Sequence, residues 1–169
     1  NVLNRDFKAE EPNQKWVTDI TYIPTTEGWA YLSTIKDLFD GFIVAHRLGK
    51  QQSVTLVADT LKMAKEKEKV TDGLILHSDQ GLQYTSHRCF VLTHQYNITP
   101  PMSRRGNCWD NAPMENFFGH LKEEALQQFK ILSFKKTKEV IDQYIHFYNY
   151  EWIQLKTRQT PYQTRCLSM

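Results

Sequence analysis

The sequence predicts an α/β protein with a five-stranded mixed sheet, flanked by helices and followed by a C-terminal helical extension. Three runs rich in β-branched and aromatic residues are joined by short turns, which is typical of an antiparallel meander; they cover 16–23, 29–36 and 42–48. A further apolar run, 74–77, follows a segment of helical periodicity, 53–69. A helical crossover between two strands favours parallel pairing, so both kinds of pairing are expected in one sheet.

The remaining segments are predicted from residues that start or stop helices and strands. Ser53 is expected to cap the first helix, and Ser86 opens a second helix that ends near residue 96. Ile98-Thr99 is expected as the fifth strand, stopped by Pro100. After a loop at 103–111, three more helices are expected, at 111–126, at 133–152 and from Thr160-Pro161 onward.

A chain of 169 residues is long enough for one domain that buries about two-thirds of its unfolded surface. Residues 1–14 lack periodicity and are expected to form an arm or linker. Residues 15–128 would form the core, and 129–169 a helical extension of the same domain. The first residue is not Met, so we expect the chain to be part of a longer protein.

The composition is ordinary for a globular protein, and the charge is uneven. The formal net charge of +2 is too small to indicate nucleic-acid binding by itself, but from Ser103 onward there are 10 Lys or Arg against 7 Asp or Glu. The three cysteines contain no Cys-x-x-Cys pair, which favours neither a disulfide framework nor a zinc module. There is no signal peptide and no apolar run of about 20 residues, so a cytoplasmic location is expected.

The stretch 77–84 places Asp79 at the end of a buried strand, just before a glycine turn. A carboxylate beside an apolar core costs several kcal/mol unless it is paired or binds a metal. Asp and Gly are also ordinary turn residues, because an Asp side chain can bond its own backbone two residues on. Asp79 alone therefore fits a capped turn as well as a functional site.

Two other carboxylates occupy positions that raise the same question. Asp19 lies in the middle of a predicted strand, where Asp is depleted, although a solvated edge position or a nearby Lys would accommodate it. Glu115 lies in the first turn of a predicted helix, where an acid also satisfies the helix dipole. Together the three acids suggest a common site, because oxygen ligands from separate elements can hold Mg²⁺ or Mn²⁺.

Basic residues near these acids could contact nucleic acid. Arg104 and Arg105 lie in a loop that also contains Gly106 and Trp109, a composition that suits a flexible nucleic-acid contact as well as an ordinary solvated loop. Lys122 follows Glu115 by two helical turns and shares its helix face. It is either a phosphate contact near the site or a surface lysine.

Four motifs in order resemble those of a known family. They are the segments 16–22, 77–84 and 103–122, together with 147–149 and 160–161 at the C-terminal end. They resemble the ribonuclease-H-like fold of DDE transposases and retroviral integrases, and most nearly the integrase-core transposase of bacterial insertion sequences, second-reading-frame type. Asp79 and Glu115 are separated by 35 residues, the spacing that this family shares with integrases.

The resemblance implies that Asp19, Asp79 and Glu115 bind two Mg²⁺ (or Mn²⁺) ions. It implies phosphodiester hydrolysis at the end of the element and strand transfer into target DNA by a homo-oligomer bound to DNA. Arg104, Arg105 and Lys122 would contact DNA. His77 and Asn111 would support the site: His77 either packs at the strand end or assists with water or phosphate beside Asp79, and Asn111 caps the helix of Glu115.

Two other readings stay open: a ribonuclease-H-like nuclease that cuts without joining, and a DNA-binding domain with lapsed catalysis. The chain also departs from the family pattern at two positions. Trp152 stands where the C-terminal signature usually has Arg, and Pro101 where Ser is usual. Trp152 puts one DNA or helix contact in doubt, and neither change touches the acids.

Overall fold

The computed structural model describes residues 8–70, 72–78, 86–99 and 111–168, and its sheet has the strand order β3-β2-β1-β4. The strands are β1 (Lys15–Thr25), β2 (Gly28–Asp37), β3 (Ile43–Gly49) and β4 (Ile75–Ser78). The helices are α1 (Val54–Lys67), α2 (His87–Gln95), α3 (Ala112–Leu121), the π-helix η2 (Lys122–Leu126), α4 (Phe134–Tyr150) and α5 (Pro161–Leu167).

The sheet is mixed, as the sequence predicts. β1 pairs with β2 and β2 with β3 in antiparallel register, and the glycines of their turns have positive φ, +104° at Gly28 and +80° at Gly41. β4 pairs with β1 in parallel after the α1 crossover. An L side chain rarely adopts such φ values, so these two glycines fix where the meander turns.

The described sheet has four strands, where the sequence predicted five. The expected fifth strand is reduced to an isolated bridge between Thr99 and Ile75. Its hydrogen bonds run from Leu76 N to Thr99 O at 2.9 Å and from Thr99 N to Leu74 O at 2.8 Å. The run that precedes Pro100 in the sequence has only two residues, Ile98 and Thr99, and proline has no N–H with which to extend a ladder.

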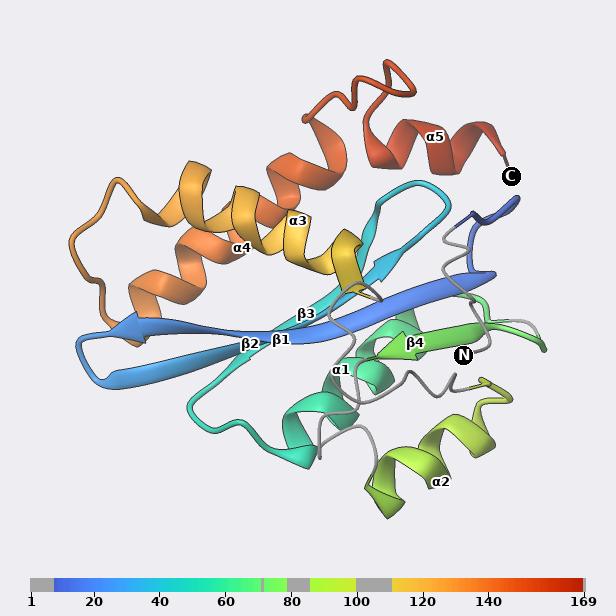
Figure 1. Ribbon diagram of the computed structural model, residues 1–169, viewed down its shortest axis with the longest axis horizontal. Helices are drawn as coiled ribbons and strands as arrows, with labels where there is room; N and C mark the ends of the chain where they lie inside the picture. The colour runs from blue at the N-terminus through green and yellow to red at the C-terminus, as the bar shows by residue number, and fades with distance from the viewer. Residues whose placement is uncertain (1–7, 71, 79–85, 100–110, 169) are drawn as a thin grey trace.

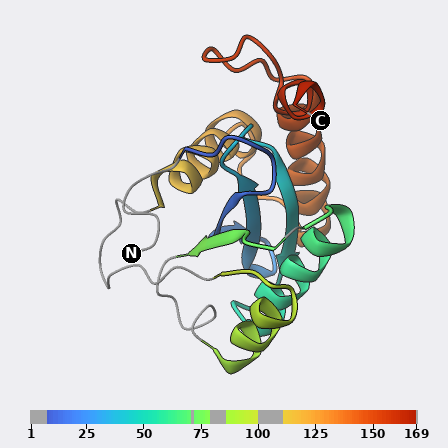
Figure 2. The same cartoon turned by 90° about the vertical axis from the view of Figure 1, so that its right-hand side faces the viewer.

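Helices cover both faces of the sheet (Figure 1). α3 and α4 lie on one side and α1 and α2 on the other, and the view turned by 90° shows the same two layers (Figure 2). On the α3 side the core combines Val17, Leu32 and Ile43 with residues of the helices; these are Met114, Phe117, Phe118, Leu121, Ile141, Ile145 and Tyr148. The other core holds Trp16 and Ile35 against α1 and α2.

Four helices start at the Ser or Thr residues where the sequence predicts them to start. The side chains of Ser53, Ser86, Ser133 and Thr160 accept hydrogen bonds from the first turns of α1, α2, α4 and α5. The helix expected at 111–126 is divided, because it continues from α3 into a π-helical turn closed by Gln127 N and Lys122 O at 2.8 Å. No helix in the described ranges is long and apolar enough to cross a membrane.

A buried ion network joins α5 to the sheet. Arg165 Nη1 donates to Asp37 Oδ2 at 3.0 Å and to Asp40 Oδ2 at 2.6 Å, and Nη2 lies 3.1 Å from Glu68 Oε2. Burial raises the pKa of Asp40 to about 6, helped by the charge of Asp37 and opposed by Arg165. The C-terminal helix is therefore held to the β2–β3 turn by charges that water does not reach.

Candidate active site

Asp19 lies on the face of the sheet that α3 covers. Side chains alternate along a strand, so Asp19 shares its face with Val17 and Ile23, which pack in the same core as α3. Its Oδ1 accepts a hydrogen bond from Ile20 N at 2.8 Å, and the carboxylate is partly exposed. A charged side chain can hold this position because it lies at the margin of the core and not within it.

The end of β4 meets β1 next to Asp19. The parallel register pairs Thr18 with Ser78, and these residues directly precede Asp19 and Asp79 in the sequence. Asp79 itself lies outside the described residues. The described strands therefore bring the chain positions just before two of the three predicted acids side by side.

Glu115 lies in the first turn of α3, on the side of the sheet where Asp19 lies. The helix is fixed by Met114, Phe117 and Phe118, which are buried against β1 and α4, while Glu115 itself is exposed. Pro113 stands within the first two positions of the helix, where its missing N–H costs nothing. The apolar side of α3 thus turns Glu115 outward at the helix start.

Lys36, which the sequence analysis did not single out, connects these two elements. It pairs with Val17 across the β1–β2 ladder, so it is a diagonal neighbour of Asp19 on the same face. Its Nζ donates to Pro113 O in the first turn of α3 at 3.4 Å and lies 5.8 Å from the centroid of the Tyr148 ring. Burial lowers the pKa of Lys36 to about 8.

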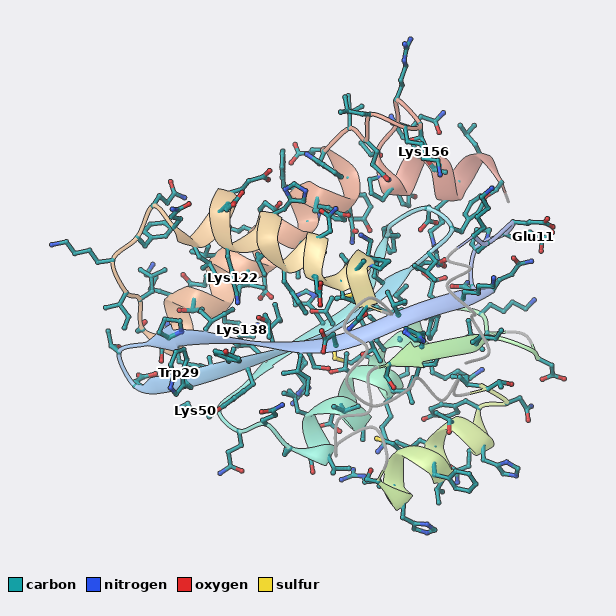
Figure 3. The ribbon with its side chains drawn as sticks, in the orientation of Figure 1. Glu11, Trp29, Lys50, Lys122, Lys138 and Lys156 are labelled. Atoms are coloured by element: carbon teal, nitrogen blue, oxygen red, sulfur yellow. The ribbon has the colours of Figure 1, made fainter. Side chains whose placement is uncertain are left out.

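Lys122 lies at the other end of α3, where the π-helix begins. Its Nζ is 5.6 Å from the centroid of the Tyr22 ring, and burial lowers its pKa. Figure 3 shows Lys122 on the helix and Trp29 on the β1–β2 hairpin, both at the same end of the molecule. Lys122 is therefore placed along the side of β1 beyond Asp19, at a distance from Glu115 of about 10 Å along the helix.

The two predicted supporting residues are both buried. His77 is fully buried in β4 and pairs with Val17. Asn111 occupies the N-cap position of α3, but its side chain makes no capping hydrogen bond, so the predicted cap is wrong in that respect. Its Oδ1 and Nδ2 are buried and have no hydrogen-bond partner among the residues that the structure describes. The predicted DNA contacts Arg104 and Arg105 lie outside the described residues.

The chemistry of the described acids suits a hard divalent cation. Asp19 and Glu115 offer carboxylate oxygens from a strand and a helix, the ligand type that Mg²⁺ and Mn²⁺ prefer. Within the described ranges, no group of three or more His, Cys, Asp or Glu side chains is arranged to hold a metal ion, and Asp79 is not among those residues.

Comparison with known families now adds to this geometry. Two family models, each described as an integrase core domain, match residues 9–108 and 115–168. The first alone covers more than half of the chain. This chain belongs to the integrase core domain family. The predicted family and the ribonuclease-H-like fold class are thereby confirmed, and the acids at Asp19 and Glu115 fall one in each matched segment.

Relatives of this integrase core domain include a transposase-like protein and a protein of an insertion element. A transposase-like protein of Haemophilus influenzae is 41% identical over 158 residues, which cover 94% of this chain and 73% of that protein. A 31 kDa protein of insertion element IS600 from Shigella sonnei is 43% identical over 150 residues, 88% of this chain and 55% of that protein. The chain thus spans little more than half the length of some of the relatives that it matches.

A solved structure shares the fold. It is the catalytic core domain of HTLV-2 integrase in complex with magnesium, in a trimeric form. The two chains are 16% identical, with a TM-score of 0.74, and the match covers 93% of this chain and 99% of that one. The sheet order and the helical layers of this integrase core domain are therefore those of a retroviral integrase core.

Proposed function

We propose that this integrase core domain is the catalytic domain of an insertion-sequence transposase. It would cut DNA at the ends of the element and join the new 3′ ends to target DNA. The observation that carries the proposal is the parallel pairing of Thr18 with Ser78, which sets the positions before Asp19 and Asp79 side by side. Glu115 enters from α3 on the same side of the sheet.

Each acid has a distinct support in the chain. Asp19 is held by the ladder of β1 with β2, and Glu115 by the buried side of α3. With Asp79 they would hold two Mg²⁺ or Mn²⁺ ions, which when bound supply an activated oxygen nucleophile and stabilise the leaving oxygen of a phosphodiester. No Ser or Tyr nucleophile is required, because the attacking group is water or a DNA 3′-hydroxyl.

Lys36 would support the same site from β2, where it contacts the first turn of α3. Carboxylates gathered at one site repel each other, and a cation on the same face lowers that repulsion. Its hydrogen bond to Pro113 O also fixes where α3 begins, and therefore where Glu115 stands. We place Lys36 beside His77 and Asn111 among the residues that position the acids.

The DNA and the partners follow from the same proposal. Arg104, Arg105 and Lys122 would contact phosphates of the element end and of the target, in the bacterial cytoplasm. Two ends have to be joined, so more than one protomer would act on the DNA. We assign residues 15–128 to the catalytic core, 129–169 to its helical extension and 1–14 to an arm.

The test uses the full-length protein that carries this chain, incubated with labelled element-end DNA and Mg²⁺ or Mn²⁺. Joining of the strands supports the proposal, cleavage alone indicates a nuclease that does not join, and binding alone indicates lapsed catalysis.

Asp79→Asn and Glu115→Gln should each lower cleavage by at least about 100-fold, because each removes a metal ligand. Glu66→Gln, which alters an exposed acid of α1 on the other side of the sheet, is the control that should leave cleavage unchanged. An Asp79→Asn protein that still cut at the normal rate would overturn the assignment.

A further inference from the structure

A groove with a volume of about 640 Å³ runs beside β1 beyond the candidate active site. One wall is formed by the end of β1 and the start of β2, including Tyr22 and Trp29. The other is formed by η2 and the segment that follows it, including Lys122, Phe129 and Lys130. The residues at 127–132 therefore face the β1–β2 hairpin across an open space.

Both walls of the groove are built on elements that carry or directly follow the acids, although neither Asp19 nor Glu115 lines it. Tyr22 follows Asp19 by three residues on β1, about 10 Å along the strand. Lys122 follows Glu115 by seven residues on one helix, also about 10 Å. β4 pairs with β1 as far as Thr18, so within the described chain the edge of β1 beyond Asp19 is not covered by that strand. A DNA strand leaving the acids along this edge would reach the groove within one or two nucleotides.

The groove has the chemistry of a site for unpaired bases. The side chains of Tyr22 and Trp29 are 60% and 54% exposed, and their rings meet edge to face at 5.3 Å between centroids. Phe129 and Ile131 on the other wall are also exposed. Aromatic rings exposed beside a lysine are the usual platform on which bases of a single strand stack, while the ammonium attracts the phosphates.

The charges around the groove favour an anionic occupant over a second copy of this chain. Two basic residues, Lys122 and Lys130, and one acidic residue, Glu123, line the groove. Lys50 lies at the same end of the molecule (Figure 3), and Lys138, also at that end, is paired with Asp142. The π-helical turn of η2 is a further sign, since such turns are uncommon and occur frequently at functional sites.

We infer that this groove, which we call the aromatic groove, binds unpaired nucleotides of the DNA strand next to the phosphodiester that is cut. Tyr22 and Trp29 would stack on the bases, and Lys122 and Lys130 would neutralise the phosphates. The inference rests on the proposed function, because it takes the substrate to be DNA whose end opens at the site. It also gives Lys122 a defined place: the phosphate that it contacts belongs to the strand lying in the groove.

The test compares the affinity of this chain for two probes in the absence of divalent metal. One probe is a blunt DNA duplex, and the other is the same duplex with a short single-stranded thymidine overhang. The wild-type chain should prefer the overhang probe, and Trp29→Ala should weaken binding of that probe by about ten-fold while leaving the blunt duplex nearly unchanged. Trp29→Phe keeps an aromatic ring and should retain most of the preference.

Two further variants keep the test decisive. Phe90→Ala removes an aromatic side chain that is equally exposed but lies on α2, away from the groove, and should change neither affinity. Phe129→Ala alters the opposite wall and should lower the overhang preference even if Trp29→Ala disturbs the hairpin. Circular dichroism establishes that each variant is folded before binding is measured.

Several outcomes would overturn the inference. These are the absence of any overhang preference in the wild type, an equal loss for both probes in Trp29→Ala, and no loss for either. Sedimentation without DNA tests the alternative occupant, a second copy of this chain. If the wild type is a dimer and Trp29→Ala abolishes the dimer, the groove is an interface between copies. If the overhang preference depends on Trp29 but the full-length protein never cuts DNA, the proposed function is wrong and the inference about the groove holds. If the protein cuts DNA but Trp29→Ala leaves the overhang preference unchanged, the proposed function holds and the inference about the groove is wrong.

Discussion

At the scale of single residues, Lys36 shows how a site on a sheet is kept at a cost to stability. Its pKa falls to about 8 from an ordinary 10.5 because burial disfavours the charged form. Below pH 8 the ammonium is charged in both the folded and the unfolded protein, so the full penalty is present. The penalty is relieved as pH rises from about 8 to about 10.5, where the folded protein has lost a proton that the unfolded chain still holds.

Replacing Lys36 should therefore separate stability from activity. We expect Lys36→Met to raise the free energy of unfolding at pH 7 by about 1–2 kcal/mol, since the buried charge is removed while the hydrogen bond to Pro113 is also lost. That gain should shrink between pH 8 and 10.5. Cleavage should fall, because the positive charge beside the acids and the anchor of α3 are both gone.

Urea unfolding at several pH values checks the first part and a DNA cleavage assay the second. Lys135→Met on the exposed side of α4 is the control, and it should alter neither quantity by more than about 0.5 kcal/mol or two-fold. A Lys36→Met protein that lost stability at pH 7 would show that the lysine is a net structural support.

At the scale of elements, the helix starts differ in what their first residue does. Ser133 Oγ accepts from Lys136 N at 3.2 Å at the start of α4, so Ser133→Ala should cost about 1 kcal/mol of unfolding free energy. Asn111 makes no such bond at the start of α3. Asn111→Ala should thus cost less than Ser133→Ala while lowering DNA cleavage. Chemical denaturation of both variants measures the difference; equal losses would mean that Asn111 is an ordinary cap.

The same elements show what the sequence could predict. The meander followed from turn glycines and the helix starts from Ser and Thr caps, all of which act within a few residues. The predicted fifth strand forms only one bridge in the described chain, because the run Ile98-Thr99 before Pro100 is short and its pairing depends on β4, far away in the sequence. Asp19 and Glu115 were predicted from unusual positions and from resemblance; they lie on one side of the sheet, and their role as metal ligands stays a prediction.

Lys36 was missed, although its pattern was visible. In the run 29–36, Leu32, Thr34 and Lys36 alternate onto one face, so the alternation alone would have placed a lysine on the covered side of the strand with Leu32. The π-helical turn at Lys122–Leu126 had no such signal, since its residues fit an ordinary α-helix. Its geometry depends on the packing of α4 beneath it, which includes the hydrogen bond of 2.7 Å from the Tyr144 hydroxyl to Glu124 Oε2.

At the scale of the whole molecule, the network around Arg165 joins the two ends of the described chain to the sheet. Arg165 from α5 reaches Asp37 and Asp40, and its Nη2 also donates to Asn13 Oδ1 at 2.7 Å, just before β1. Both aspartates are almost fully buried. Burial raises the pKa of each one, and the guanidinium opposes that rise.

Removing Arg165 should leave two buried carboxylates without their cation. Arg165→Met should lower the free energy of unfolding at pH 7 by about 3–5 kcal/mol. The loss should be smaller at pH 5, because the pKa of Asp40 is already about 6 in the wild type, so its carboxyl is protonated there and needs no partner. Adding Asp37→Asn and Asp40→Asn to Arg165→Met should recover most of the loss at pH 7, since the uncompensated charges are then gone.

Thermal and urea unfolding at pH 5 and pH 7 measure all three effects. A loss in Arg165→Met that is independent of pH, and that the triple variant does not recover, would mean that Arg165 holds α5 by stacking of its guanidinium on the Phe42 ring and not by its ion pairs.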